Sequence, residues 1–381
     1  MRVVVHMGMH KTGTTSVQKY FHHTPLPGVS YVTSHGSNHS RLFLLMFADP
    51  AHVATQGAFT EDGPEAVARL SQERTEAQQA VEAQLHALAG TGHTVIFSAE
   101  QISAPPFSEA RARMHGFFRG FTDDLTAVGY VRAPLSYAVS AFQQRLRGPQ
   151  PLDPQALCLL PRYRVRFQQM DALFGRANVH LGRFAPAALR GGDVVSDFAH
   201  RIGVTLPGPP PARSNESLSL EATALLYMHR VLGVGRITGV PGALRINRDF
   251  DTLLRGIGRT RFTFAPALWE PVLQSRQADL DWIRARLGDP LDDAPPAGQA
   301  VAGPADLLAI AERQGPALEA LLLVQPDGLL AGPIAAALPS TRLEPRARVL
   351  RLLALLRDVA SAGHAARMAR RARRARRIAL A

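Results

Sequence analysis

A short glycine loop near the start of the chain restricts its fold more than any other feature. The apolar run RVVVHM leads into GMHKTGTT, Gly8 to Thr15, and then into the helix-like segment SVQKYF. This order predicts a turn whose backbone N–H groups lie at the positive end of a helix dipole. Hydroxyl residues open the helix at Thr14, Thr15 and Ser16. We therefore expect the loop to hold a phosphate or another tetrahedral oxyanion.

The lysine of this loop stands in an unusual place. The glycine spacing is that of a nucleotide phosphate loop, G-x-x-x-x-G, in which Lys follows the second glycine, yet Thr14 stands there. Lysine comes earlier, at Lys11, and only Lys11 and Lys19 are lysines among the 43 basic residues. Arginine is a planar fork, whereas lysine is a compact point charge on a flexible stem. The pattern indicates that position 11 needs an ammonium group.

Apolar runs and helix-like segments alternate along the first half of the chain. After VVVHM we expect strands at 29–33, 94–100, 127–133 and 177–184, and helices at 14–21, 65–89 and 135–146. This alternation predicts an α/β fold with a parallel sheet flanked by helices. Ligands of such sheets bind at the carboxyl ends of the strands, which is where the glycine loop lies.

Two proline-rich breaks, at 206–215 and 288–304, suggest the domain organisation. The segment 288–304 predicts an α/β domain at 1–290, a linker at 291–304 and a helical C-terminal extension at 305–381. Apolar residues at helical spacing from Val349 to Val359 predict that the first half of the last helix packs on another element.

The positive charge gathers in the tail. The formal net charge is +12, but the segment from Leu343 onward holds eleven arginines against Glu344 and Asp358. The rest of the chain gives no sign of a specific nucleic-acid surface. Three interpretations of the tail stay open: docking onto an anionic membrane, docking onto an acidic partner, or a solvated terminus.

Cysteine content and hydropathy bear on the compartment. Cys158 is the only cysteine, which excludes an intramolecular disulfide and a cysteine-based zinc site in this chain. A reducing compartment is therefore expected, and with it a cytoplasmic protein, membrane-associated if the tail binds lipid. The sequence has no apolar run of bilayer length and no signal-peptide pattern at its start.

Two motifs together resemble those of one enzyme family. HMGMHKTGTTSVQ is similar to the 5′-phosphosulfate loop of sulfotransferases that use 3′-phosphoadenosine 5′-phosphosulfate (PAPS). The family also has an Arg that ends a strand and a Ser eight residues later in the following helix. YVRAPLSYAVSAFQQ supplies Arg132 and Ser140 at that spacing. The resemblance covers about residues 1–290 and is to bacterial enzymes that act on glycans or lipids.

The resemblance implies a fold, a co-substrate and a set of roles. It implies a P-loop-like parallel core, PAPS as co-substrate, and metal-free in-line transfer of the sulfuryl group to a hydroxyl of a glycan or lipid-type acceptor. Lys11 would support the leaving 5′-phosphate, while Arg132 and Ser140 would bind the 3′-phosphate. The remaining cofactor-binding residues implied are His10, Thr12, Gly13, Thr14, Thr15 and, in RSNESLS, Arg213.

A base is expected because the acceptor hydroxyl loses its proton as it attacks sulfur. Glu100 ends the expected strand TVIFSAE, and bacterial sulfotransferases similar to this chain carry an acidic residue after a comparable strand. His39, in HGSNHSRLF after the second strand, is the alternative, since imidazole is a natural base near neutral pH. We rank Glu100 first and His39 second.

Two other function classes stay open. A nucleotide kinase would use the loop for ATP, although the Lys after Gly13 is absent and no strand-end Asp is well placed for magnesium. A non-catalytic protein that binds a nucleotide or polyanion would use the basic tail as its working part.

Overall fold

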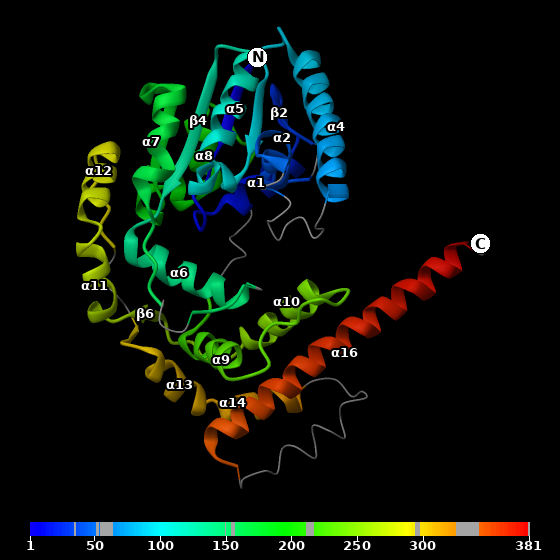
Figure 1. Ribbon diagram of the computed structural model, residues 1–381, viewed down its shortest axis with the longest axis vertical. Helices are drawn as coiled ribbons and strands as arrows, with labels where there is room; N and C mark the ends of the chain where they lie inside the picture. Colours follow the sequence, from blue (N-terminus) through cyan, green and yellow to red (C-terminus); the bar gives the residue numbers. More distant parts are fainter. Residues whose placement is uncertain are drawn as a thin grey trace. The chain divides into compact units, whose positions relative to one another are not determined.

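The computed structural model divides the chain into two compact units (Figure 1). It describes residues 1–33, 36–50, 53, 64–148, 150–153, 157–210, 217–293, 298–324 and 343–379. The first unit comprises Met1–Pro134, Pro161–Ser214 and Arg276–Asp292. The second comprises Leu135–Leu160, Asn215–Ser275 and Asp293–Ala381.

The first unit contains a five-stranded parallel sheet with the order β2-β3-β1-β4-β5. Its strands are β1 Arg2–His6, β2 Val29–Tyr31, β3 Thr94–Ser98, β4 Leu125–Val131 and β5 Val179–Arg183. In the register, His6 at the end of β1 pairs with Ser98 of β3 and with Val128 of β4. The predicted α/β class and parallel sheet are confirmed.

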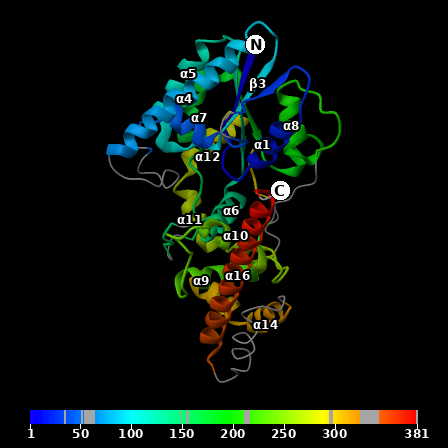
Figure 2. The same cartoon turned by 90° about the vertical axis from the view of Figure 1, so that its right-hand side faces the viewer.

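Helices cover both faces of this sheet. They are α1 Thr14–His23, α2 Ser40–Phe47, α4 Pro64–Leu88, α5 Ser108–Arg119, α7 Tyr163–Phe174, α8 Val194–Arg201 and α12 Gln277–Leu287. Successive strand side chains point to opposite faces. On one face Val4 packs with Val17 of α1 and Phe198 of α8, and on the other Phe97 contacts Phe118 of α5. Figure 2 shows α1 and α8 on one side of the sheet and α5 and α7 on the other.

The connections that follow the neighbouring strands β1 and β3 lead to opposite faces of the sheet. β1 continues into α1, whereas its neighbour β3 continues through the 3₁₀ turns Glu100–Ser103 and Pro105–Phe107 into α5. Ligand sites of open α/β sheets form where neighbouring connections diverge in this way. The fold therefore places the glycine loop and Glu100 on the two sides of one switch point.

The second unit is mainly helical. Its helices are α6 Pro134–Arg147, α9 Leu220–Val231, α10 Ala243–Leu254, α11 Pro266–Gln274, α13 Pro304–Glu312, α14 Gly315–Leu323 and α16 Pro345–Ala379. Two short strands, β6 Phe262–Phe264 and β7 Gln299–Val301, pair in parallel. Val349, Leu352, Leu353 and Leu356 are buried in its core, which confirms that the first half of the last helix packs. No helix in the described part of the chain is long and apolar enough to cross a membrane.

These units differ from the domains expected from the sequence. Phe142 of α6 and Leu226 of α9 share one apolar core with Leu353 of α16, so residues 135–160 and 215–275 belong to the second unit. The expected extension is therefore part of a larger body. The expected linker at 291–304 contains β7, while residues 294–297 lie outside the described ones.

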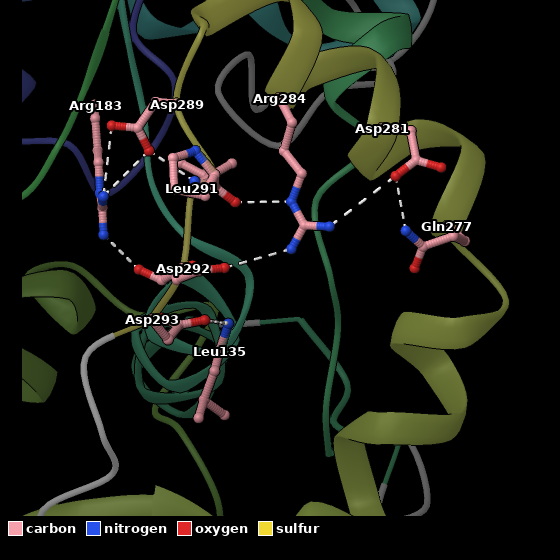
Figure 3. A network of polar contacts seen from close by, with 10 residues as sticks. Leu135, Arg183, Gln277, Asp281, Arg284, Asp289, Leu291, Asp292 and Asp293 are labelled. Carbon is pink, nitrogen blue, oxygen red and sulfur yellow. Dashed lines mark hydrogen bonds and ion pairs between the residues drawn. The ribbon is translucent and has the colours of Figure 1, made fainter.

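Arginines fix the chain where α12 ends (Figure 3). Arg183, the last residue of β5, forms a salt bridge of 3.1 Å with Asp289 and donates to the backbone oxygen of Asp292. Arg284 of α12 donates to the carbonyl oxygen of Pro290 at 2.7 Å. The segment that follows α12 is thus bound to the sheet within the first unit.

A carboxylate caps the first turn of α6. Asp293 accepts hydrogen bonds from the backbone N–H groups of Leu135 and Ser136, at 2.7 and 2.8 Å (Figure 3). These N–H groups have no partner within the helix, and the helix dipole favours a negative charge beside them. An anion bound near this helix must therefore be held by side chains rather than by these two amides.

Candidate functional site at the carboxyl end of β1

The glycine loop has an unusual backbone. Gly8, Lys11 and Gly13 all have left-handed conformations, with φ of 82°, 69° and 74°. For a residue other than glycine this conformation costs about 1–3 kcal/mol, and such strain gathers at functional sites. Alternation between left- and right-handed residues turns successive N–H groups inward, which is typical of anion-binding concavities. The strained residue of the loop is thus the lysine itself.

Two of the expected ligand hydroxyls bond within the loop. Thr12 donates from Oγ1 to the carbonyl oxygen of Met9 at 2.5 Å, and Thr14 donates to the same oxygen at 3.4 Å. Both side chains are buried, whereas Thr15 is exposed. The hydroxyl protons of Thr12 and Thr14 therefore bond within the loop, and cofactor binding by these two residues stays a prediction. Gly13 caps α1 without a side-chain hydrogen bond, which leaves the first helical N–H groups for an anion.

Gly13 is required by both its conformation and its surroundings. A Cβ atom there would lie 2.8 Å from Cγ1 of Val194 and 3.2 Å from Cε2 of Phe184. Gly28 has a similar φ of 68°, but a Cβ atom there would meet nothing within 4 Å. Comparing Gly13 with Gly28 therefore separates the free-energy cost of a left-handed conformation from the cost of steric overlap with neighbouring side chains.

We expect Gly13→Ala to lower the free energy of unfolding by about 1–3 kcal/mol more than Gly28→Ala, because only the first substitution overpacks its neighbours. Urea unfolding of both variants measures the difference. Equal losses would show that the contact of the loop with α8 is not tight.

Arg132 joins the second motif to the glycine loop. This residue follows the last residue of β4, and its Nη1 donates to the carbonyl oxygen of Lys11 at 3.0 Å. Its own carbonyl oxygen accepts from the hydroxyl of Tyr163 at 2.7 Å, and its guanidinium carbon lies 5.9 Å from the ring centre of Phe184. Two motifs 121 residues apart in sequence are thereby in direct contact.

Two residues implied by the resemblance are not part of this contact. Ser140 is a half-buried residue of α6 in the second unit, so its pairing with Arg132 stays a prediction. Arg213 lies outside the described residues.

Glu100 lies directly against the glycine loop. It is the first residue of the 3₁₀ turn after β3, and a Cβ atom on Gly8 would come within 3.2 Å of its Cα and Cβ atoms. Gly8 therefore permits the close approach of the two segments. The half-buried residue follows β3, the strand next to β1, two residues after that strand ends at Ser98, and its role as a base stays a prediction.

The charges of this site act on the pKa of His10. Burial lowers its pKa below the ordinary value of 6.5, and the positive charges of Arg166 and Lys11 lower it further, while the carboxylate of Glu100 opposes them. The imidazole is therefore neutral at physiological pH. The charges of Glu100, Arg166 and Lys11 thus all act on one neutral imidazole.

His39 has a structural role, which corrects its prediction as an alternative base. Its ring is fully buried; Nε2 lies 2.7 Å from the carbonyl oxygen of Val32, and Nδ1 accepts from the backbone N–H of Ser98 at 2.9 Å. Both ring nitrogens are bonded to backbone groups, so the imidazole has no lone pair to offer a substrate. It joins the chain after β2 to the end of β3.

A second buried histidine supports the sheet beneath the loop. Nδ1 of His6 lies 2.9 Å from Oγ of Ser98, and the ring contacts Phe198. Burial lowers the pKa of His6 to about 3, so the ring is neutral at physiological pH. His6 therefore contributes packing and a hydrogen bond rather than charge.

Sequence reasoning missed two buried arginines beside Glu100. Arg111 of α5 and Arg166 of α7 occur in ordinary helical segments, EARARM and YRVRFQQM. Arginine on a helix normally faces solvent, so only the packing of the fold reveals them. No sequence pattern would have found these two residues.

A separate hollow of about 300 Å³ lies at the amino end of β4, lined by His115, Arg119, Asp123, Leu125, Leu173, Phe174, Gly175 and Asn178. In a parallel sheet this is the edge opposite the glycine loop. It therefore contributes no group to the site described above.

The groups able to hold an anionic ligand are Lys11, Arg132, the loop amides and Arg166. Among the described residues, no group of three or more His, Cys, Asp or Glu side chains gathers in a form that could hold a metal ion. The chain matches no family model, no curated protein and no solved structure.

Proposed function

We propose that this protein is a PAPS-dependent sulfotransferase that transfers the sulfuryl group to a hydroxyl of a glycan or glycolipid-type acceptor. The contact of 3.0 Å between Nη1 of Arg132 and the carbonyl oxygen of Lys11 carries this proposal. In the family that the two motifs resemble, one motif holds the 5′-phosphosulfate and the other the 3′-phosphate. A ligand with anionic groups at both ends of one ribose requires both motifs at one edge of the sheet.

The arrangement of the strands supports a P-loop-like core. The glycine loop follows β1, the central strand, and leads into a helix on one face. The neighbouring strand β3 leads to the other face and carries Glu100 at its end. Donor and acceptor groups are thus expected on the two sides of the switch point.

The proposed reaction is an in-line displacement at sulfur. The acceptor oxygen forms a bond to sulfur while the bond between sulfur and the 5′-phosphate oxygen breaks, and 3′,5′-ADP leaves. Glu100 takes the acceptor proton. The ammonium of Lys11 stabilises the charge that develops on the leaving oxygen, and a preorganised donor of this kind is worth about 3–4 kcal/mol.

Arg132 has the role of binding the 3′-phosphate, with Ser140 as its predicted partner. A hydrogen bond between charged groups contributes about 1.5–3 kcal/mol. The 3′-phosphate should therefore raise affinity strongly, although it takes no part in the chemistry.

Titration calorimetry with 3′,5′-ADP, 5′-AMP and ATP in the absence of magnesium tests this assignment. We expect 3′,5′-ADP to bind about 10- to 100-fold more tightly than 5′-AMP, and Arg132→Ala or Ser140→Ala to remove most of the difference. Arg162→Ala, at an exposed position before α7, is the matched control and should bind like the parent protein.

Two other results would contradict the proposal. Equal binding of the three nucleotides, or binding of ATP that depends on magnesium, would favour a nucleotide kinase. Tight 3′,5′-ADP binding without sulfuryl transfer to any acceptor, unchanged by Glu100→Gln, would favour a nucleotide-binding protein without turnover.

A further inference from the structure

Two arginines are buried against the turn that begins at Glu100, and neither has an acidic partner among the described residues. Arg111 is only 1% exposed and Arg166 is 9% exposed. All their hydrogen bonds to described residues go to backbone carbonyl groups, and neither forms a salt bridge with a described carboxylate. Burying a cation without a counter-charge is costly, so the pair requires an explanation.

The burial of Arg111 is explained by its hydrogen bonds to the backbone. Its guanidinium donates to the carbonyl oxygens of Ala104 at 3.0 Å and of Pro105, Val165 and Arg166 at 3.4 Å. It therefore fastens the first turn of α7 to the chain that follows Glu100. Burial lowers the pKa of Arg111 to about 10, and the neighbouring charge of Arg166 adds to the effect. Arg111 is a structural residue that fixes the backbone of Arg166.

The burial of Arg166 is not explained by hydrogen bonds of this kind. Its Nη1 donates to the carbonyl oxygen of Ser103 at 3.3 Å, which is its single hydrogen bond to a described residue, against four for Arg111. Its Nε, like that of Arg111, is buried and has no hydrogen-bond partner among the described residues. A guanidinium group has five N–H donors in a fixed planar fork. One long hydrogen bond leaves most of this capacity unused.

Partly buried arginines of the same unit have the acidic partner that Arg166 lacks among the described residues. Arg286 forms two hydrogen bonds of 2.7 Å with the carboxylate of Asp171, and Arg201 pairs with Asp197 at 2.5 Å. Arg166 is more buried than most paired arginines, yet no described carboxylate pairs with it. A ligand is the natural source of the absent negative charge.

The position of Arg166 assigns it to the acceptor side of the site. It bonds to Ser103, in the same turn as Glu100, and its charge acts on His10 of the glycine loop. Lys11 and Arg132 already account for the phosphates of the proposed donor. Arg166 is thus a third cation, which is hydrogen-bonded from α7 to the segment that carries the proposed base.

We infer that Arg166 binds an anionic group of the acceptor, so that the substrate is a hydroxyl compound carrying a carboxylate, sulfate or phosphate close to the reacting hydroxyl. This inference rests on the proposed function. A guanidinium fork forms a bidentate pair with each of these anions. Such a pair beside Glu100 orients the neighbouring hydroxyl toward the carboxylate that takes its proton.

Binding of small sugars to the full chain saturated with 3′,5′-ADP tests the inference. Glucuronate, glucose 6-sulfate, glucose 6-phosphate and glucose are the probes, with dissociation constants measured by ligand-observed NMR. We expect at least one anionic sugar to bind about 10- to 100-fold more tightly than glucose. The best of the three identifies the carboxylate, the sulfate or the phosphate as the group recognised.

Substitutions on α7 connect this preference to Arg166. Arg166→Gln should reduce the affinity for the preferred anionic sugar to that for glucose, whereas Arg166→Lys should keep part of the preference because the charge remains. Arg164→Gln, at an exposed position of the same helix, is the matched control and should change nothing. Retained 3′,5′-ADP binding shows that each variant is folded.

The outcomes separate the inference from the proposed function. If no anionic sugar binds more tightly than glucose to the parent protein, or if Arg166→Gln keeps the preference, the inference is wrong while the sulfotransferase proposal stands. If Arg166→Gln unfolds the chain, two measurements still test the inference. They are the preference of the parent protein for an anionic sugar over glucose, and the preference of Arg166→Lys. Failure of 3′,5′-ADP to bind overturns the proposed function, and the inference with it.

Discussion

Lys11→Ala is expected to lower kcat by about 10²- to 10³-fold, which is the usual effect of removing one preorganised donor at a developing negative charge. The affinity for 3′,5′-ADP should change much less, since loop amides and Arg132 bind the same ligand in the ground state. An interaction that strengthens only in the transition state lowers kcat rather than binding. Single-turnover rates with PAPS, set beside calorimetric binding of 3′,5′-ADP, measure the two effects separately.

Three further substitutions test whether the loss of kcat comes from the ammonium group of Lys11 rather than from backbone strain or from the loss of any lysine. Lys11 has a left-handed φ of 69°, so Lys11→Gly should leave the fold at least as stable while still losing the rate. Lys11→Arg should also lose most of the rate, because a planar fork does not reproduce a compact point charge. Lys19→Arg on the exposed face of α1 should behave like the parent protein. A rate within about threefold of the parent for Lys11→Ala would contradict the role in leaving-group support.

The sequence predicted the local parts of the fold well. Five apolar runs became the five parallel strands, and the glycine loop became a strained turn before α1, because strand, turn and helix propensities are local. The division into units was not predictable in this way. Phe142 lies on an apolar helix face that could pack on many partners, and only the complete fold shows that it joins α9 and α16.

The candidate site shows the same limit. Lys11 and Arg132 were found because they stand in motifs with fixed spacing, and the structure brings them into contact. The prediction of His39 as a base failed because nothing in HGSNHSRLF shows that its ring bonds to the backbone of nearby Val32 and of Ser98 on another strand. Arg166 was missed for the converse reason, since its importance comes from an absent partner that no sequence pattern records.

Glu100→Gln is expected to lower turnover by about 10²- to 10⁴-fold, the usual contribution of a general base. The amide keeps the shape of the side chain, so Gly8 still fits against it and 3′,5′-ADP binding should be unchanged. Glu109→Gln, at an exposed position of α5 in the same unit, is the control and should retain the parent rate.

The rival outcome assigns the base to His10, and substitution of each residue separates the two. Burial lowers the pKa of His10 below 6.5, so its imidazole is already deprotonated in neutral solution. If His10 were the base, His10→Gln would lose the rate and Glu100→Gln would keep it, and the parent rate would fall only as the pH drops below 6.5. If Glu100 is the base, His10→Gln should leave a substantial rate, because the imidazole then only tunes the charge around the carboxylate. A large loss confined to Glu100→Gln is the result that the contact between Glu100 and Gly8 leads us to expect.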